Sequence, residues 1–247
     1  MKRLALLLIP VAAAALTACS PAPEPEKPTI TVYADSALTE AFTKIGADFE
    51  ASQGIKVRFV FGASSALKKQ LENGSPADVY ASASQDTMHL MSKVFATNRL
   101  VIATPYGNPK DIATVGQLGP RSSPQVSFAA CVPEAPCGSA LKPWIEQAGF
   151  APGERPVPKV TAQDAKETLA KLSAGEVDAA IVYASDVKNT KFSATPVRVA
   201  RNEEPHPADL KFPIAIVSGS PEAKKFYDYA FSDPAKTALT DAGFELP

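Results

Sequence analysis

The alternation of short β-rich runs with amphipathic helical segments restricts the fold of this 247-residue chain more than any other feature. The runs at 29–34 (TITVYA) and 56–61 (KVRFVF) are typical of strands. Between them, Leu38, Phe42 and Ile45 recur at the spacing of one helical face. Strand and helix in this order predict an α/β protein whose sheets are mainly parallel and flanked by helices.

The same pattern continues to the end of the chain. Further strands are expected at 78–82, 100–104, 125–131, 178–184 and 212–218, and the terminal helices at 221–231 and 234–242. Met88, Met91 and Phe95 predict another helix ahead of the strand at 100–104. Ser220 and Asp233 are the expected caps of the terminal helices, because Pro follows each of them.

The first 28 residues have the composition of an export leader and a spacer. A short basic start precedes an apolar run from 4 to 16, which is too short to span a bilayer as a mature helix. The sequence LTAC that ends at Cys19 is similar to a bacterial lipobox, although an ordinary signal with a chance cysteine is the alternative. We therefore expect a signal peptide at 1–18, an acylated Cys19 that anchors the exported protein to the membrane, and a Pro-rich tether at 19–28.

Two cysteines remain after Cys19, in the segment CVPEAPC. Cys131 and Cys137 are the only others in the sequence, and the expected compartment is oxidising. Two remaining cysteines that lie this close together in the sequence favour a local disulfide. The alternative is a nucleophilic thiol, which requires a basic partner, and both histidines lie far away in the sequence.

Composition argues against several classes of function. The 25 basic and 26 acidic side chains give a net charge of −1, so no basic field attracts nucleic acid. Two histidines and three cysteines disfavour a metal centre built from these residues, and we expect no cofactor. A secreted serine hydrolase is a weaker alternative, because G-x-S-x-G is absent and few bases are available to activate a serine.

Several of the expected strands lead into a helix through small or hydroxyl residues. These turns contain 35–37 (DSA), 62–65 (GASS), 137–139 (CGS) and 163–165 (QDA). In an open α/β sheet, ligands lie beyond the carboxyl ends of the strands, where helix N-termini offer N–H groups that hold an anion without Lys or Arg. Capping explains any one turn, whereas several of similar composition favour a shared anion site.

Five segments of the chain carry a family resemblance. They are ITVYADSALTEAF, FVFGASSALKKQLENGSPADVYASAS, PEAPCG, EVDAAIVYASD and FYDYAFSDPAKTALTDAGF, and they lie between about residues 29 and 244. The chain resembles the periplasmic molybdate-binding proteins of ABC importers. This resemblance implies a two-lobed class II periplasmic-binding fold. The Pro- and Gly-rich stretches at 104–109 and 203–213 are candidate crossings, so we expect lobe 1 at 29–103 and 214–247 and lobe 2 at 104–213. The resemblance also implies a monomeric receptor, not an enzyme, that delivers molybdate or tungstate to a permease.

The resemblance also implies which positions contact the ligand. These are Ser36, Ala37, Ser64, Ser65, Cys137, Ala165 and Tyr183. Many members have serine directly before leucine in the first turn, where this chain has Ala37, so either its N–H or the Ser36 hydroxyl is the implied contact. Asp35 is expected to point away from the anion and to cap or pair. Pro143 predicts that its helix starts no earlier than about Ser139, or is kinked.

Molybdate explains why such a site contains only donors. It is a dianion without a proton near neutral pH, so it only accepts hydrogen bonds. Monohydrogen phosphate carries a proton and requires an acceptor, which a donor-only site lacks. Sulfate and thiosulfate remain alternative ligands, because only the size of the cavity separates sulfate from molybdate.

Overall fold

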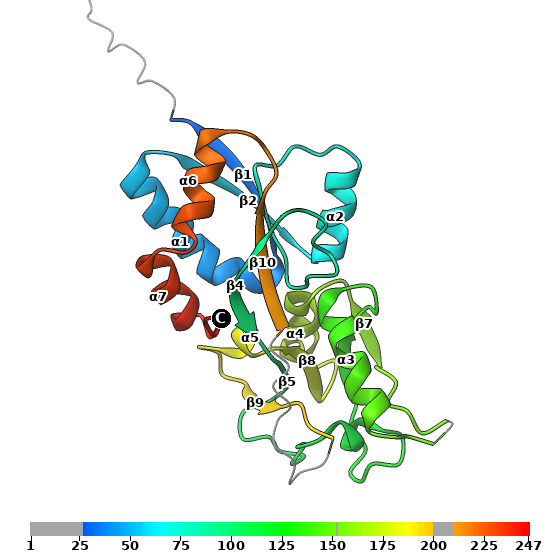
Figure 1. The fold of residues 1–247 in the computed structure, drawn as a ribbon. Helices are drawn as coiled ribbons and strands as arrows, with labels where there is room; N and C mark the ends of the chain where they lie inside the picture. The colour runs from blue at the N-terminus through cyan, green and yellow to red at the C-terminus, as the bar shows by residue number, and fades with distance from the viewer. Residues whose placement is uncertain (1–26, 152, 200–209) are drawn as a thin grey trace, which may run out of the picture.

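The structure is a computed structural model that describes residues 27–151, 153–199 and 210–247 (Figure 1). The expected signal peptide, the lipidation site at Cys19 and most of the tether therefore lie outside the described residues. In the described ranges, no helix has both the length and the hydropathy needed to cross a membrane.

The described strands form two five-stranded sheets, which occupy the upper and lower halves of the molecule in Figure 1. The first sheet has the order β2-β1-β3-β10-β4, with bounds Lys56–Gly62, Thr29–Asp35, Val79–Ala81, Leu210–Ile216 and Lys93–Asn98. The second has the order β7-β6-β8-β5-β9, with bounds Val160–Ala162, Phe128–Cys131, Ala179–Tyr183, Leu100–Thr104 and Ser193–Pro196. We call these sheets with their flanking helices lobe 1 and lobe 2.

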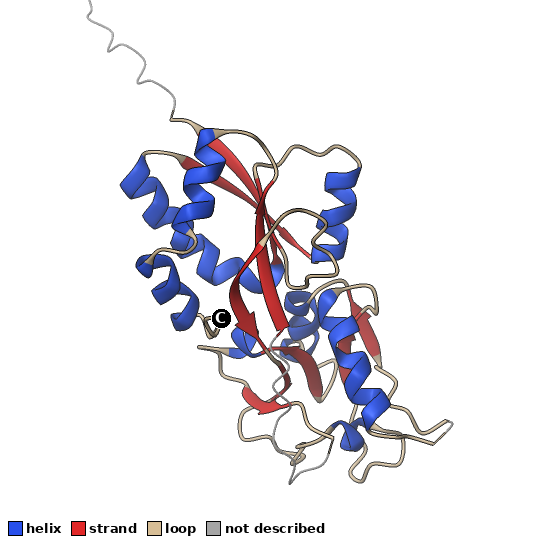
Figure 2. Ribbon diagram, viewed as in Figure 1, coloured by secondary structure: helices blue, strands red, loops and turns tan. Residues whose placement is uncertain are grey.

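Helices flank both sheets (Figure 2). Lobe 1 contains η1 (Ser36–Leu38), α1 (Thr39–Gln53), α2 (Ser64–Glu72), α6 (Pro221–Tyr229) and α7 (Asp233–Asp241). Lobe 2 contains η2 (Val115–Leu118), α3 (Pro136–Gln147), α4 (Ala165–Ser173) and α5 (Ala184–Val187). The predicted α/β class is confirmed.

Both sheets are mixed rather than mainly parallel. In each, the described strands make two parallel and two antiparallel pairings. The antiparallel strands are β10 in lobe 1 and β5 in lobe 2, each between two partners. They reverse direction because the chain passes between the sheets here, with only Arg99 separating β4 from β5.

According to the sheet pairings, the chain has passed from one lobe to the other before each of the two lobe boundaries expected from sequence. β5 pairs with β8 and β9 of lobe 2, although a boundary after residue 103 assigns it to lobe 1. β10 starts at Leu210 and pairs with β4 of lobe 1, although the expected return is at residue 214. Pro- and Gly-rich composition marks loops but does not identify the partner of a neighbouring strand, which explains both differences.

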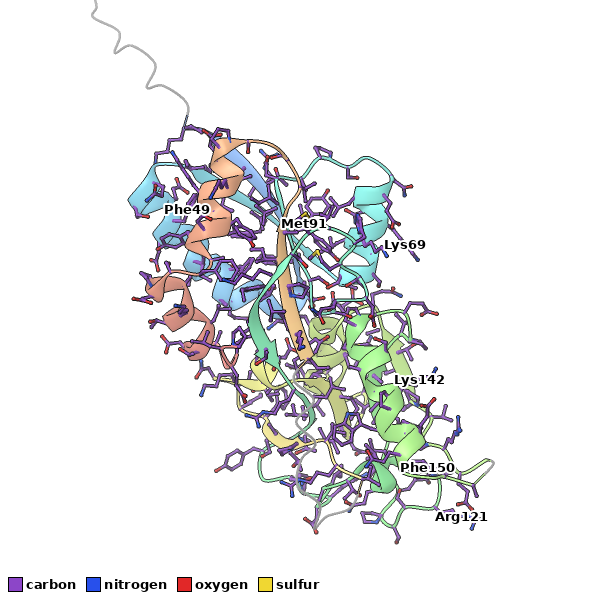
Figure 3. The ribbon with its side chains drawn as sticks, in the orientation of Figure 1. Phe49, Lys69, Met91, Arg121, Lys142 and Phe150 are labelled. Atoms are coloured by element: carbon purple, nitrogen blue, oxygen red, sulfur yellow. A yellow bond between two sulfur atoms is a disulfide. The ribbon has the colours of Figure 1, made fainter. Side chains whose placement is uncertain are left out.

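Two local predictions are wrong. Met88, Met91 and Phe95 do not form a helix, because Phe95 lies on β4, whose pairing with β10 overrides the helical spacing. Met91 is 98% exposed in the preceding loop (Figure 3). α3 begins at Pro136 and includes Pro143, so the start near residue 139 is not observed, and the alternative of a kink at Pro143 stays a prediction. The cap of α7 is Ser232 rather than Asp233.

The core of lobe 1 packs α1 against the sheet and against α6. The predicted helical face is confirmed, since Phe42 and Phe49 of α1 are fully buried. The Phe49 ring lies edge-on to Phe226 of α6, with 5.2 Å between ring centroids, and Figure 3 shows Phe49 beside that helix. Aromatic pairs of this geometry add about 0.5–1.5 kcal/mol beyond the buried area, so this pair helps to hold α1 and α6 together.

Candidate anion-binding site

Parallel pairing brings the predicted turns together two by two. In lobe 1, Asp35 at the end of β1 is in register with Gly62 at the end of β2, so η1 and α2 start side by side. In lobe 2, Cys131 at the end of β6 is in register with Ala162 at the end of β7, so the segments leading into α3 and α4 are also neighbours. Each sheet therefore presents two helix starts at one edge.

The two edges meet between the lobes. α4 of lobe 2 contacts η1 of lobe 1. Lys166 Nζ on α4 lies 2.7 Å from both carboxylate oxygens of Glu40 on α1, which joins the lobes directly. A cavity of about 430 Å³ opens nearby, between Ala83 of lobe 1 and Pro136 and Ser139 of lobe 2. None of the predicted contact residues lines this cavity, although Cys137 follows Pro136 directly. All of them are buried except Ser65, which is partly exposed.

Two of the predicted hydroxyls are buried without a partner. Among the described residues, Ser36 Oγ and Tyr183 OH have no hydrogen-bond partner, although their residues are only 4% and 1% exposed. Leaving a buried polar group unpaired costs about 1–3 kcal/mol. One hydroxyl comes from each lobe, so the structure leaves open donors on both sides of the interface.

Backbone donors lie at the starts of α3 and α4. Cys137 and Ala165 belong to the first turns, so their N–H groups have no acceptor within their own helices. The predicted disulfide is confirmed, with Cys131 and Cys137 Cα atoms 5.8 Å apart, and the free-thiol alternative is excluded in this structure. The bridge ties the start of α3 to the end of β6.

Asp35 pairs as expected, but it does not point away from the site. Its Oδ1 accepts from Ala37 N at 3.1 Å. Its Oδ2 accepts from Ser64 N at 3.1 Å and from Ser64 Oγ at 2.5 Å. Ser64 Oγ also accepts from Ala83 N at 3.0 Å, and its one hydroxyl proton is already donated to Asp35. The carboxylate thus occupies donors that the resemblance assigns to the ligand.

Burial dominates the protonation of the acidic groups here. It raises the pKa of Asp35 to about 6, against the lowering effect of the hydrogen bonds from Ser64 and Ala37. It raises the pKa of Asp186 to about 7, opposed by Lys166 and by the N–H of Tyr183. Burial and the neighbouring carboxylates raise the pKa of the Tyr183 phenol well above its usual value, so it remains a donor at neutral pH.

A family model decides the classification. The model for bacterial extracellular solute-binding proteins matches residues 30–245. The chain belongs to this family. Its relatives include the molybdate-binding protein ModA of Mycobacterium bovis, which is 34% identical over 95% of this chain and 94% of that protein.

Solved structures show that this solute-binding protein has a two-lobed periplasmic-binding fold. The periplasmic molybdate-binding protein of Azotobacter vinelandii matches with a TM-score of 0.69 and 16% identity, over 88% of this chain and 99% of that one. The sulfate-binding protein SubI of Mycobacterium tuberculosis also matches with a TM-score of 0.69, at 17% identity over 89% and 87% of the two chains. The fold is therefore shared by receptors of different oxyanions.

The sequence did not indicate every residue of the site in this solute-binding protein. Asp186 accepts from Tyr183 N at 3.0 Å, and its position three residues after Tyr183 is a capping spacing that could have identified it. Lys166 also lies 3.4 Å from Asp186 Oδ1. Its pairing with Glu40 spans 126 residues, and no local pattern signals such a contact.

Proposed function

We propose that this solute-binding protein is a lipid-anchored, extracytoplasmic receptor that captures molybdate and delivers it to an ABC importer. The observation that carries the proposal is a pair of buried hydroxyls, Ser36 Oγ and Tyr183 OH, on opposite sides of the lobe interface, neither of which has a hydrogen-bond partner among the described residues. The 34% identity to a molybdate-binding protein over nearly the whole chain supports the choice of ligand.

Uncharged donors suffice for a dianion in this setting. Ser36, Cys137, Ala165 and Tyr183 offer hydroxyl or backbone donors, with Ser64, Ser65 and Ala37 beside them. A hydrogen bond to a charged group contributes roughly 1.5–3 kcal/mol, so about six give on the order of 9–18 kcal/mol before ordering and desolvation are subtracted. The remainder corresponds to dissociation constants of roughly nM to μM.

Anchoring and delivery complete the proposal. Acylation of Cys19 would hold the protein at the outer face of the membrane, and the tether would separate the folded part from the lipid surface. The ion pair of Lys166 with Glu40 favours the closed arrangement of the lobes. We expect the permease to bind a monomer in this closed form.

Titration calorimetry tests the function. In the mature chain from Ser20 onward, which retains every described residue, we expect one molybdate site with a dissociation constant of about 1 μM or tighter. Tungstate should bind comparably, because it is also a tetrahedral dianion without a proton, and phosphate should bind at least about tenfold more weakly. Tighter binding of sulfate than of molybdate would identify sulfate as the ligand. Absence of binding heat with every oxyanion would contradict an oxyanion receptor.

A further inference from the structure

The Asp35 carboxylate is the feature of the anion site that the proposed function does not explain. Its residue is 3% exposed, and it accepts three hydrogen bonds, from Ala37 N, Ser64 N and Ser64 Oγ. These donors start the two helical segments of lobe 1 that face lobe 2. A carboxylate in this position competes with an incoming anion for the same hydrogen bonds.

The surrounding charges make this competition stronger. Asp164 at the start of α4 and Asp186 on α5 interact electrostatically with Asp35, as do the phenols of Tyr80 and Tyr183. Lys166 on α4 is already paired with Glu40 and Asp186. An ionised Asp35 and a dianion would therefore repel each other where little water is present to screen them.

The hydrogen bonds also indicate which oxygen can take a proton. Oδ2 accepts both donors of Ser64, which occupy its two lone pairs. Oδ1 accepts only from Ala37 N, so one lone pair remains. A proton on Oδ1 removes the charge and converts this oxygen into an O–H donor, which restores a site made of donors.

We propose that Asp35 is the proton-accepting group of the anion site, so that one proton from solvent is bound by its carboxyl as a dianionic oxyanion enters. This inference rests on the proposed function and adds its pH dependence. Burial raises the pKa of Asp35 to about 6. Above that pH the free site is ionised, so binding includes the uptake of a proton and weakens as the pH rises.

The test is calorimetric titration of the mature chain from Ser20 with molybdate, between about pH 6.5 and about pH 8.5, in buffers of different ionisation enthalpy. We expect uptake that approaches one proton per molybdate near about pH 8, and a dissociation constant that increases about tenfold per pH unit above Asp35's pKa. Binding without proton uptake would overturn this inference and leave the proposed function standing. Absence of binding at every pH would overturn both.

Variants assign the proton to Asp35. Asp35→Asn, and Asp35→Ala as a second variant, should abolish the uptake and flatten the pH dependence of the dissociation constant. The matched control is Asp178→Asn, because Asp178 also accepts from the N–H and hydroxyl of one serine, Ser127, but at the opposite end of β8 from Tyr183. It should retain the uptake. Uptake that persists in both Asp35 variants would assign the proton to another group and overturn the proposal.

Discussion

Replacement of Gly138 with alanine is expected to lower the free energy of unfolding by about 3 kcal/mol and to weaken molybdate binding at least about tenfold. A Cβ at this position would lie 2.1 Å from the carbonyl oxygen of Val132 and 2.9 Å from that of Cys131. These are backbone atoms, and the disulfide to Cys137 limits their movement. The start of α3 must therefore shift, and the Cys137 N–H shifts with it.

Chemical denaturation and titration calorimetry measure the two effects of Gly138→Ala. Gly219→Ala is the matched control, because nothing lies within 4 Å of a Cβ at residue 219. It should change neither quantity appreciably. If Gly138→Ala had the same stability and molybdate affinity as the unsubstituted protein, this prediction would be wrong. The close approach of α3 to the end of β6 would then not be needed for folding or for binding.

Tyr183→Phe is expected to weaken molybdate binding by about 1.5–3 kcal/mol, or roughly ten- to a hundredfold, without loss of stability. The Tyr183 hydroxyl is buried and has no partner among the described residues, so its removal relieves an unpaired polar group. In the complex the same hydroxyl would donate to a charged oxygen. The stability of the free protein and its affinity should therefore change independently, which melting curves and calorimetric titrations measure.

Ser64→Ala provides the contrast to Tyr183→Phe. The Ser64 hydroxyl donates to Asp35 and accepts from Ala83 N, so its loss leaves a buried N–H unpaired and should lower stability by about 1–3 kcal/mol. If Tyr183 had only a structural role, Tyr183→Phe would likewise lower the stability. Loss of stability in Tyr183→Phe with unchanged affinity would therefore contradict its role as a ligand donor.

The predictable part of this structure is the part encoded in short segments. All the described strands except β4, β7 and β9, the buried face of α1, and the turns that contain Ser36, Ser64, Cys137 and Ala165 follow from local periodicity and from small residues at helix starts. The disulfide followed from an even number of cysteines at short spacing.

The features that sequence did not predict depend on contacts between distant segments. Asp35 was expected to avoid the site, but its partner Ser64 is 29 residues away, and only the pairing of β1 with β2 brings the two together. Phe95 fits a helical spacing, yet its segment forms a strand because it pairs with β10, which lies more than a hundred residues later in the chain. Sheet order and the orientation of a buried carboxylate are properties of the assembled fold.

The central claim is that neutral donors from both lobes surround one tetrahedral dianion, and a crystal of the molybdate complex tests it most directly. Anomalous scattering from molybdenum locates the ligand without reference to the protein atoms. We expect one strong peak between the lobes, with the oxyanion oxygens about 2.7–3.2 Å from donors of Ser36, Cys137, Ala165 and Tyr183. A molybdenum peak elsewhere, or one that contacts donors of a single lobe, would contradict this account.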